Sequence, residues 1–247
     1  MKLDEHGMWW IRRRALRLLK ANVPFTASSP QYKEIVSSTG WAKTPTSGTT
    51  CGFLCHWLLH KLGCTEADRM NRADGGMGLK YENGGNISIL FIGLKATRAV
   101  RNGGSFSWNA AGPFVRVAEP YAKPSAKNPY FNALEQAIAT GVGGPKAGDI
   151  VFIRDPGGSN LSEHVFVFMS AEKGADGIYW NTAEAGQANG TDGDLKRRKI
   201  MPSGATDGYT RIDGNTPIRT VIGWLDLSKL DWAPNAVEMS SIEEIGY

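Results

Sequence analysis

Apolar residues recur at helical spacing in two stretches of the chain. The first stretch has arginines between its apolar positions and predicts an amphipathic helix near the N-terminus, with one face packed on the domain. A basic amphipathic helix can also lie on a membrane surface, and that alternative stays open. After a polar stretch over residues 26–50, the second predicts a helix from Cys51 to Leu62, ended by Gly63. The apolar positions of the first stretch are Met8, Ile11, Ala15, Leu18 and Leu19.

Farther along, the pattern changes from helical to strand-like. Helices are predicted from Ile87 to Val100 and near Tyr130 to Thr140, and strands follow from Gly148 onward. This order favours an α+β domain with an antiparallel sheet over alternating β and α units. The segment from residue 186 to 214, with its basic run at 196–199, is expected to be a surface excursion between two strands. The predicted strands are Asp149–Arg154, His164–Ser170, Ile178–Ala183 and Thr220–Leu225.

Composition and charge narrow the class of protein only in part. The 247 residues are 41% hydrophobic and 21% charged, as in a globular domain, and an odd count of 3 cysteines argues against a disulfide framework. A net charge of +4 and a pI near 8.9 favour anionic partners such as nucleic acid, a lipid surface or the cell wall. Arginines at 12–14 stand where a Sec signal needs apolar residues, so we expect synthesis in the cytoplasm without a Sec signal and no stable membrane insertion.

Cys51 is the strongest candidate for chemistry in this chain. On a helical wheel it lies on the apolar face with Leu54, Cys55 and Leu58, while His60 points the opposite way. It also stands in the first turn of the predicted helix, where the helix dipole and unbonded N–H groups stabilise a thiolate. The same N–H groups, that of Cys51 included, can stabilise an oxyanion during acyl transfer.

The three cysteines also allow two other interpretations. All of them can be small core residues, which suits Cys55 well. The spacing C-x3-C-H-x3-H-x3-C also looks like a metal cluster, but on one helix Cys51 and His60 project in opposite directions and cannot close one tetrahedral site. We therefore expect no metal and no cofactor.

His164 is the expected base, because it alone of the 4 histidines opens a predicted strand. If the strands from His164 and from Ile178 form a hairpin, Glu184 falls beside His164, and Asn181 lies opposite Val167 or Phe168. Glu184 is therefore the preferred group to orient the imidazole, with Asn181 and Gln187 as weaker candidates. The alternative is that Glu184 is a solvent-exposed residue at the end of a strand, with no role at the site.

Four segments together resemble the papain-like peptidoglycan hydrolases, the group that includes the NlpC/P60 and CHAP families. The resemblance implies a papain-like fold, with N-terminal helices and the nucleophile helix packed on an antiparallel β-sheet. It implies Cys51 as nucleophile, His164 as base and Glu184 as the third residue. The four segments are residues 50–54 (TCGFL), 145–153 (PKAGDIVFI), 163–167 (EHVFV) and 221–225 (VIGWL).

The chain departs from the family pattern at two places. Thr50 stands where the family has Asp or Gln before the cysteine, and residues 184–187 read Glu-Ala-Gly-Gln in place of Glu-x-Asn. The identities of the oxyanion donor and of the third residue therefore stay open, with Thr50, Asn181 and Gln187 as candidates beside Glu184. The expected organisation is one domain over 1–247, with the catalytic helix at 51–62, an insertion at 66–144 and the sheet at 148–226.

The resemblance implies a cysteine amidase or endopeptidase that cleaves amide bonds in peptidoglycan stem peptides. A hydrolase of this kind without a Sec signal looks like the amidase effectors of bacterial type VI secretion, antibacterial toxins that act in the periplasm of a target cell. The implied partners are peptidoglycan, an immunity protein and the secretion machinery, and not nucleic acid.

Two other functions remain open at this point. The same thiol could serve a deamidase, an acyltransferase or a protease that acts on protein substrates. A non-enzymatic basic binding module would instead use its basic runs and tryptophans, such as Trp9, Trp10 and Trp180, to grip sugar or nucleic acid.

Overall fold

The computed structural model describes residues 1–37, 50–65, 143–154, 163–187, 192–201 and 219–245, together with 101–102, 105–106, 114–116 and 211–212. The helices are α1 (Glu5–Asn22), α2 (Pro30–Ser37), α3 (Thr50–Lys61), the short 3-10 helix η2 (Leu227–Lys229) and α7 (Ala236–Ile245). The strands are β1 (Arg101–Asn102), β2 (Ser105–Phe106), β3 (Phe114–Arg116), β4 (Ile150–Arg154), β5 (Glu163–Gly174), β6 (Gly177–Gln187), β7 (Asp192–Met201), β8 (Arg211–Ile212) and β9 (Arg219–Leu225).

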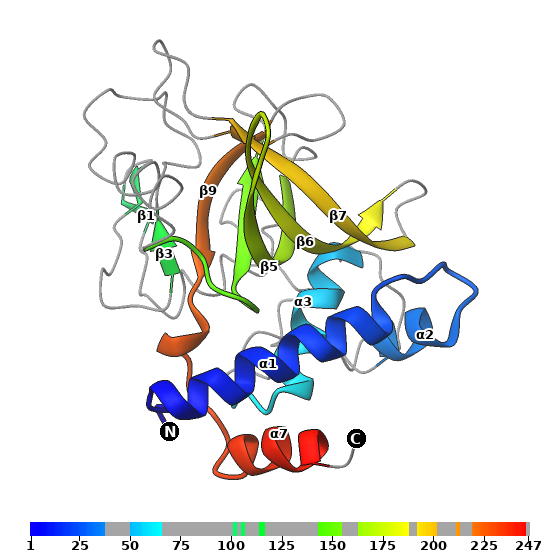
Figure 1. Ribbon diagram of the computed structural model, residues 1–247, viewed down its shortest axis with the longest axis vertical. Helices are drawn as coiled ribbons and strands as arrows, with labels where there is room; N and C mark the ends of the chain where they lie inside the picture. Colours follow the sequence, from blue (N-terminus) through cyan, green and yellow to red (C-terminus); the bar gives the residue numbers. More distant parts are fainter. Residues whose placement is uncertain are drawn as a thin grey trace.

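The main sheet is antiparallel and closes on itself. Its strands follow the order β3-β9-β4-β5-β6-β7-β8, and β8 also pairs with β9. The strands from β4 to β9 therefore form a barrel, and β3 extends it beside β9. With helices on one side of this sheet (Figure 1), the fold is α+β with an antiparallel sheet, as predicted.

Alternating residues of the strands build two separate hydrophobic clusters. One face of β5 and β6, with Val165, Val167 and Ala183, belongs to the cluster that also contains α3 and α1. The other face is directed into the barrel, because strands alternate their side chains between the two sides. The cluster inside the barrel consists of Val151, Ile153, Phe166, Phe168, Trp180, Ile200, Ile212, Val221 and Trp224.

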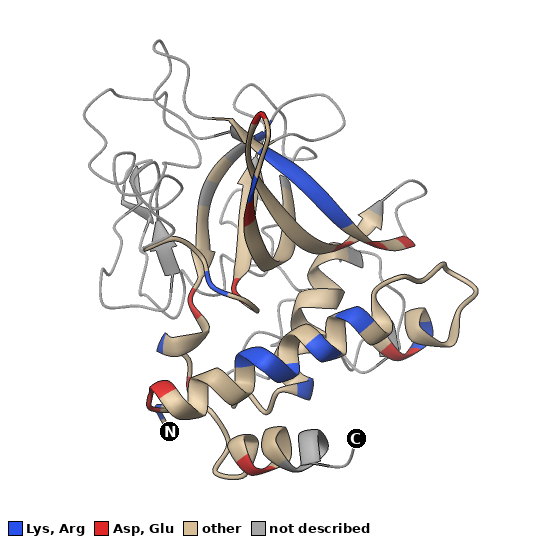
Figure 2. Ribbon diagram, viewed as in Figure 1, with Lys and Arg blue, Asp and Glu red and all other residues tan. Residues whose placement is uncertain are grey.

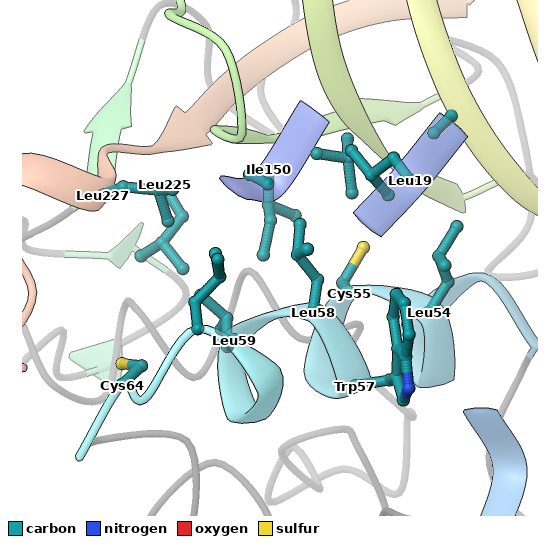
Figure 3. Close-up of a cluster of buried hydrophobic side chains, with 14 of the residues drawn as sticks. Leu19, Leu54, Cys55, Trp57, Leu58, Leu59, Cys64, Ile150, Leu225 and Leu227 are labelled. Atoms are coloured by element: carbon teal, nitrogen blue, oxygen red, sulfur yellow. The ribbon is translucent and has the colours of Figure 1, made fainter. Parts of the chain in front are cut away.

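The helix α3 packs on β5 and β6, also contacts α1 and α2, and is buried along most of its length. Figure 3 shows Leu58 and Leu59 directed toward Ile150 and Leu225, while Leu19 approaches from α1. On the far side of α1 lies α7 (Figure 1). In the described part of the chain, no helix combines the length and apolarity that crossing a bilayer requires.

The helices and strands predicted next to the site are confirmed. The predicted first helix is α1, whose N-cap Asp4 accepts a 2.7 Å hydrogen bond from the Gly7 N–H. The predicted catalytic helix is α3, and Gly63 follows it with φ +81°, a conformation that glycine adopts easily. The predicted strands correspond to β4, β5, β6 and β9.

The expectation of a surface excursion at 186–214 is wrong, because this segment contains β7 and β8. In β7 the buried positions are Gly193, Arg198 and Ile200, and only Ile200 is a large apolar residue, so the sequence of β7 shows no hydrophobic alternation. Two helices, α2 in the polar stretch and α7 at the C-terminal end, were not predicted. The predicted helices at 87–100 and 130–140 lie outside the described residues, as does most of the insertion at 66–144.

The predicted hairpin exists, but its register was wrong. Asn181 lies opposite Ser170, not opposite Val167 or Phe168, and Val167 pairs with Ala183. The strands extend to a tight turn between Gly174 and Gly177, and a bulge shifts the register past Phe168. A longer hairpin with a bulge cannot be deduced from hydrophobic alternation, since the bulge adds an unpaired residue to one strand only.

Candidate active site

Cys51 lies in the first turn of α3, with 6% of its surface exposed. The helix begins at Thr50, so the N–H of Cys51 belongs to the N–H groups that have no acceptor within the helix. The positive end of the helix dipole stabilises a negative charge on the sulfur. The packing of α3 on β5 and β6 brings this turn to the strands that carry the histidine and the glutamate.

His164 is hydrogen-bonded with both Cys51 and Glu184. Its Nε2 lies 2.9 Å from Oε2 of Glu184, and the residue is 6% exposed. With Nε2 on the glutamate, Nδ1 is the ring nitrogen left for the thiol of Cys51. The prediction that Glu184 lies beside His164 is confirmed, although the contact is diagonal across β5 and β6.

Glu184 is fully buried, and several hydrogen-bond donors stabilise the negative charge of its carboxylate. The Thr182 hydroxyl donates to Oε1 at 2.6 Å, and the Arg198 guanidinium donates to both carboxylate oxygens. Burial alone would raise the pKa of Glu184, but hydrogen bonds from Arg198 and His164 hold it well below the ordinary value of 4.5. The carboxylate is therefore an anion at any neutral pH.

The charges around His164 favour the imidazolium. Burial lowers the pKa of His164, but hydrogen bonds with Cys51 and Glu184 outweigh that effect and raise the pKa above its ordinary value of 6.5. A protonated imidazole next to a thiol stabilises the thiolate, so Cys51 and His164 suit a thiolate–imidazolium pair.

Cys55 lies one helical turn after Cys51 and has a different character. Burial raises the pKa of Cys55 well above its ordinary value of 9.0, and the charges of Cys51 and Glu184 raise it further. The thiol of Cys55 is completely buried and stays protonated. Of these two neighbouring cysteines, only Cys51 has the surroundings of a nucleophile.

The structure does not bring Asn181 into this site. The Asn181 amide donates to the Ser170 hydroxyl at 3.1 Å and to Glu172 at 3.2 Å, on the exposed side of the hairpin. Gln187 ends β6 opposite Asp192, and Thr50 begins α3, but the side chains of both lie outside the described residues.

An ion pair between α1 and the buried Asp149 anchors the strand next to the site on the first helix. Arg12 of α1 donates at 2.7 Å to Asp149, and the same carboxylate accepts from the N–H groups of Lys146 at 2.8 Å and Leu227 at 3.1 Å. The carbonyl of Asp149 accepts from the N–H of Phe168 at 2.9 Å, which ties this corner to β5. Asp149 thereby fixes the start of β4 beside the strand of His164.

The turn before β4 also requires a glycine. Gly148 has φ +89°, and a Cβ at this position would lie 2.8 Å from Leu227 and 3.2 Å from Ala15. The Gly148-Asp149 pair in the resemblance therefore has a structural role, since it lets α1 and η2 approach the corner closely.

Within the described part of the chain, no group of three or more His, Cys, Asp or Glu side chains is placed to hold a metal ion. His60 is exposed at the end of α3, whereas His56 is buried. The site brings together a thiol, an imidazole and a buried carboxylate.

Sequence reasoning missed Arg198 and Thr182 as members of this site. Thr182 could have been found, because it alternates with Trp180 and Glu184 along β6 and therefore shares their side of the strand. Arg198 gave no such signal, since it stands within a run of basic residues that otherwise suggests a solvated surface.

Comparisons of this chain with family models, with curated proteins and with solved structures found no match. The contacts among Cys51, His164, Glu184 and Arg198 are therefore the basis for the assignment of a function.

Proposed function

We propose that this protein is a papain-like cysteine amidase or endopeptidase that cleaves amide bonds in peptidoglycan stem peptides. One observation carries the proposal: His164 is hydrogen-bonded on one side with Cys51, at the start of a helix, and on the other with the buried carboxylate of Glu184. A nucleophile, a base and an orienting group in this order are the elements of acyl transfer by a thiol.

The proposed reaction begins with attack by the Cys51 thiolate on the carbonyl carbon of an amide. The oxyanion of the tetrahedral intermediate accepts a hydrogen bond from the N–H of Cys51 in the first turn of α3. The His164 imidazolium donates its proton to the leaving amine, and a thioester with Cys51 remains. Neutral His164 then takes a proton from water, whose oxygen attacks the thioester; the carboxylic acid product leaves, and the Cys51 thiolate and His164 imidazolium are restored.

The choice of peptidoglycan as substrate rests on the resemblance of four segments to NlpC/P60 and CHAP hydrolases. The described fold supports that choice, because a helix carrying the cysteine packs on an antiparallel sheet whose adjacent strands carry the histidine and the glutamate. Delivery by type VI secretion into the periplasm of a target cell, with an immunity protein in the producer, belongs to the same proposal.

The alternative of a basic binding module has less support. Trp180, one of the tryptophans considered for sugar or base stacking, is 2% exposed and lies inside the barrel. Within the basic run of β7, Arg198 binds Glu184, Arg197 binds Glu172, and Lys199 binds Asp176. Side chains already paired with carboxylates of the same chain are poorer candidates for contacts with phosphates.

Digestion of purified sacculi tests the proposal. Wild-type protein should release new muropeptides, identified by mass spectrometry, with a cleaved amide bond in the stem peptide. Cys51→Ala and His164→Ala should release none, while Cys55→Ala, a control on the same helix face, should retain the activity. Expression directed to the periplasm should lyse cells for the wild type and the control only.

The same experiment separates the proposed substrate from a protein substrate. Sacculi that stay intact with a protein whose Cys51 reacts readily with iodoacetamide would overturn the peptidoglycan assignment and leave a deamidase, acyltransferase or protease. Lysis that persists in both Cys51→Ala and His164→Ala would overturn the mechanism itself.

A further inference from the structure

Arg198 is the one buried residue of the basic run at 196–199. The run gives β7 a long basic stretch in Figure 2, yet Arg198 is only 7% exposed. Its neighbours face outward, where Arg197 pairs with Glu172 and the ammonium of Lys199 lies 2.7 Å from Asp176. The alternation of the strand therefore turns Arg198 into the barrel.

Inside the barrel, the guanidinium meets both oxygens of Glu184. Nε donates to Oε1, and Nη2 donates to Oε2. Because Arg198 stands opposite Trp180 in the register of β6 and β7, its side chain extends along β6 past the Thr182 position to reach the carboxylate. A two-pronged contact of this kind fixes both the position and the plane of a carboxylate.

A buried ion pair is not required to fill the barrel. Removing two charges from water costs several kcal/mol per ion, and well-packed apolar side chains of similar volume stabilise a core at least as well. Phe166, Trp180 and Ile200 belong to the apolar cluster that fills most of this interior. The Arg198–Glu184 pair is instead explained by the next contact of Glu184, which lies 2.9 Å from His164.

We propose that Arg198 is a positioning residue for the Cys51–His164 pair: it clamps Glu184 so that the carboxylate stays ionised and faces the imidazole. The inference rests on the proposed function only in taking Cys51 and His164 as a reactive pair, and it is independent of the substrate. The clamp aligns Oε2 of Glu184 with Nε2 of His164. Its positive charge also offsets part of the carboxylate charge, which keeps the imidazolium acidic enough to release its proton.

The described charged or titratable groups around His164 and Glu184 lie on three elements. They are Cys51 and Cys55 on α3, Glu184 on β6 and Arg198 on β7. Without the guanidinium, the full charge of Glu184 would act on His164, so the imidazole would hold its proton to higher pH.

Nuclear magnetic resonance of the full chain with isotope-labelled histidine tests this role. The chain has 4 histidines, so the His164 signals are identified by their loss in His164→Ala. Arg198→Gln should raise the pKa of His164 by about 1, since a positive charge a few ångströms away is removed. It should also shift the resonance of the proton on Nε2, which reports the hydrogen bond with Glu184.

Arg198→Lys separates charge from geometry. Lysine keeps the positive charge but cannot form the two-pronged contact, so the pKa of His164 should stay near the wild-type value while the Nε2 proton resonance shifts. The matched control is Arg197→Gln, the exposed arginine next to it, which should change neither signal. These readouts need no substrate, so they stand even if sacculi prove not to be cleaved.

Two outcomes would overturn the proposal. The first is a folded Arg198→Gln variant, with a wild-type circular dichroism spectrum, in which both the pKa of His164 and the Nε2 proton resonance are unchanged. If Arg198→Gln does not fold, the decision falls to Arg198→Lys, and an unchanged Nε2 proton resonance in that variant would equally exclude a positioning role.

Discussion

Nε2 of His164 lies 2.9 Å from Oε2 of Glu184, and the two residues stand on neighbouring strands of the barrel. Glu184 has almost no exposure to water, so its charge acts on the imidazole with little screening. This contact turns a buried carboxylate into the group that sets the orientation and the protonation of the proposed base.

Glu184, and not Asn181, should be the residue that orients the imidazole of His164. Glu184→Gln should lower kcat/KM on sacculi or a stem-peptide substrate by about 100-fold or more, because a neutral amide supports the imidazolium poorly. Asn181→Ala, on the exposed side of the same strand, should leave kcat/KM within about twofold. A large loss in the Asn181 variant with a small loss in the Glu184 variant would reverse the assignment.

Stability should depend on pH through the same pair. The pKa of His164 is raised above 6.5, so its contribution is complete below 6.5 and is lost as the pH rises through the folded-state value. The pKa of Glu184 is lowered below 4.5, so its contribution is complete above 4.5 and is lost as the pH falls through the folded-state value.

The two contributions therefore coincide between pH 4.5 and 6.5. In urea unfolding, Glu184→Gln should lower the free energy of unfolding most in this window, by about 3 kcal/mol for a broken buried pair. A difference between variant and wild type that stays constant from pH 3 to pH 9 would contradict this account.

The cysteines should differ in reactivity although they lie on one helix. At pH 7 iodoacetamide should label Cys51 at least about tenfold faster than Cys55, since each unit of pKa changes the thiolate fraction about tenfold. The labelled peptides are quantified by mass spectrometry. His164→Ala should slow the labelling of Cys51 and leave Cys55 unchanged, whereas equal rates at both cysteines would remove the case for a nucleophile.

The anchor between α1 and β4 should also be sensitive to pH. Burial raises the pKa of Asp149 to about 6, and the adjacent Arg12 opposes that rise. Because the folded-state pKa lies above the ordinary value of 3.8, the fold favours the protonated carboxyl, and ionisation costs stability as the pH rises through about 6.

Arg12→Ala should therefore destabilise the protein more at pH 8 than at pH 5, with a loss of about 3 kcal/mol at the higher pH. At pH 5 the Asp149 carboxyl is largely protonated with or without Arg12, so the difference is smaller. Arg13→Ala is the neighbouring control on α1, and thermal unfolding at both pH values measures the effect. A larger loss at pH 5 than at pH 8 would show that Arg12 does not act through Asp149.

Much of the candidate site could be predicted from the sequence, because it depends on local periodicity. The helical spacing around Cys51 predicts both the buried face and the position in the first turn, and the short apolar runs predict the strands of His164 and Glu184. The predicted register between these strands was wrong, because the hairpin contains a bulge past Phe168 that hydrophobic alternation does not reveal. Glu184 still reaches His164, because the contact is diagonal and tolerates a shift along the strand.

The sequence by itself determined which residues could form the nucleophile, the base and its orienting group, since helix starts and strand alternation are local properties of the chain. Only the tertiary structure decided that Arg198 turns inward to Glu184, that β7 and β8 close the barrel, and that Arg12 anchors Asp149. These relationships join residues far apart in the sequence, and each depends on which side of a strand or helix is buried. A charged residue is buried only where a partner compensates its charge, and that partner cannot be identified from the sequence alone.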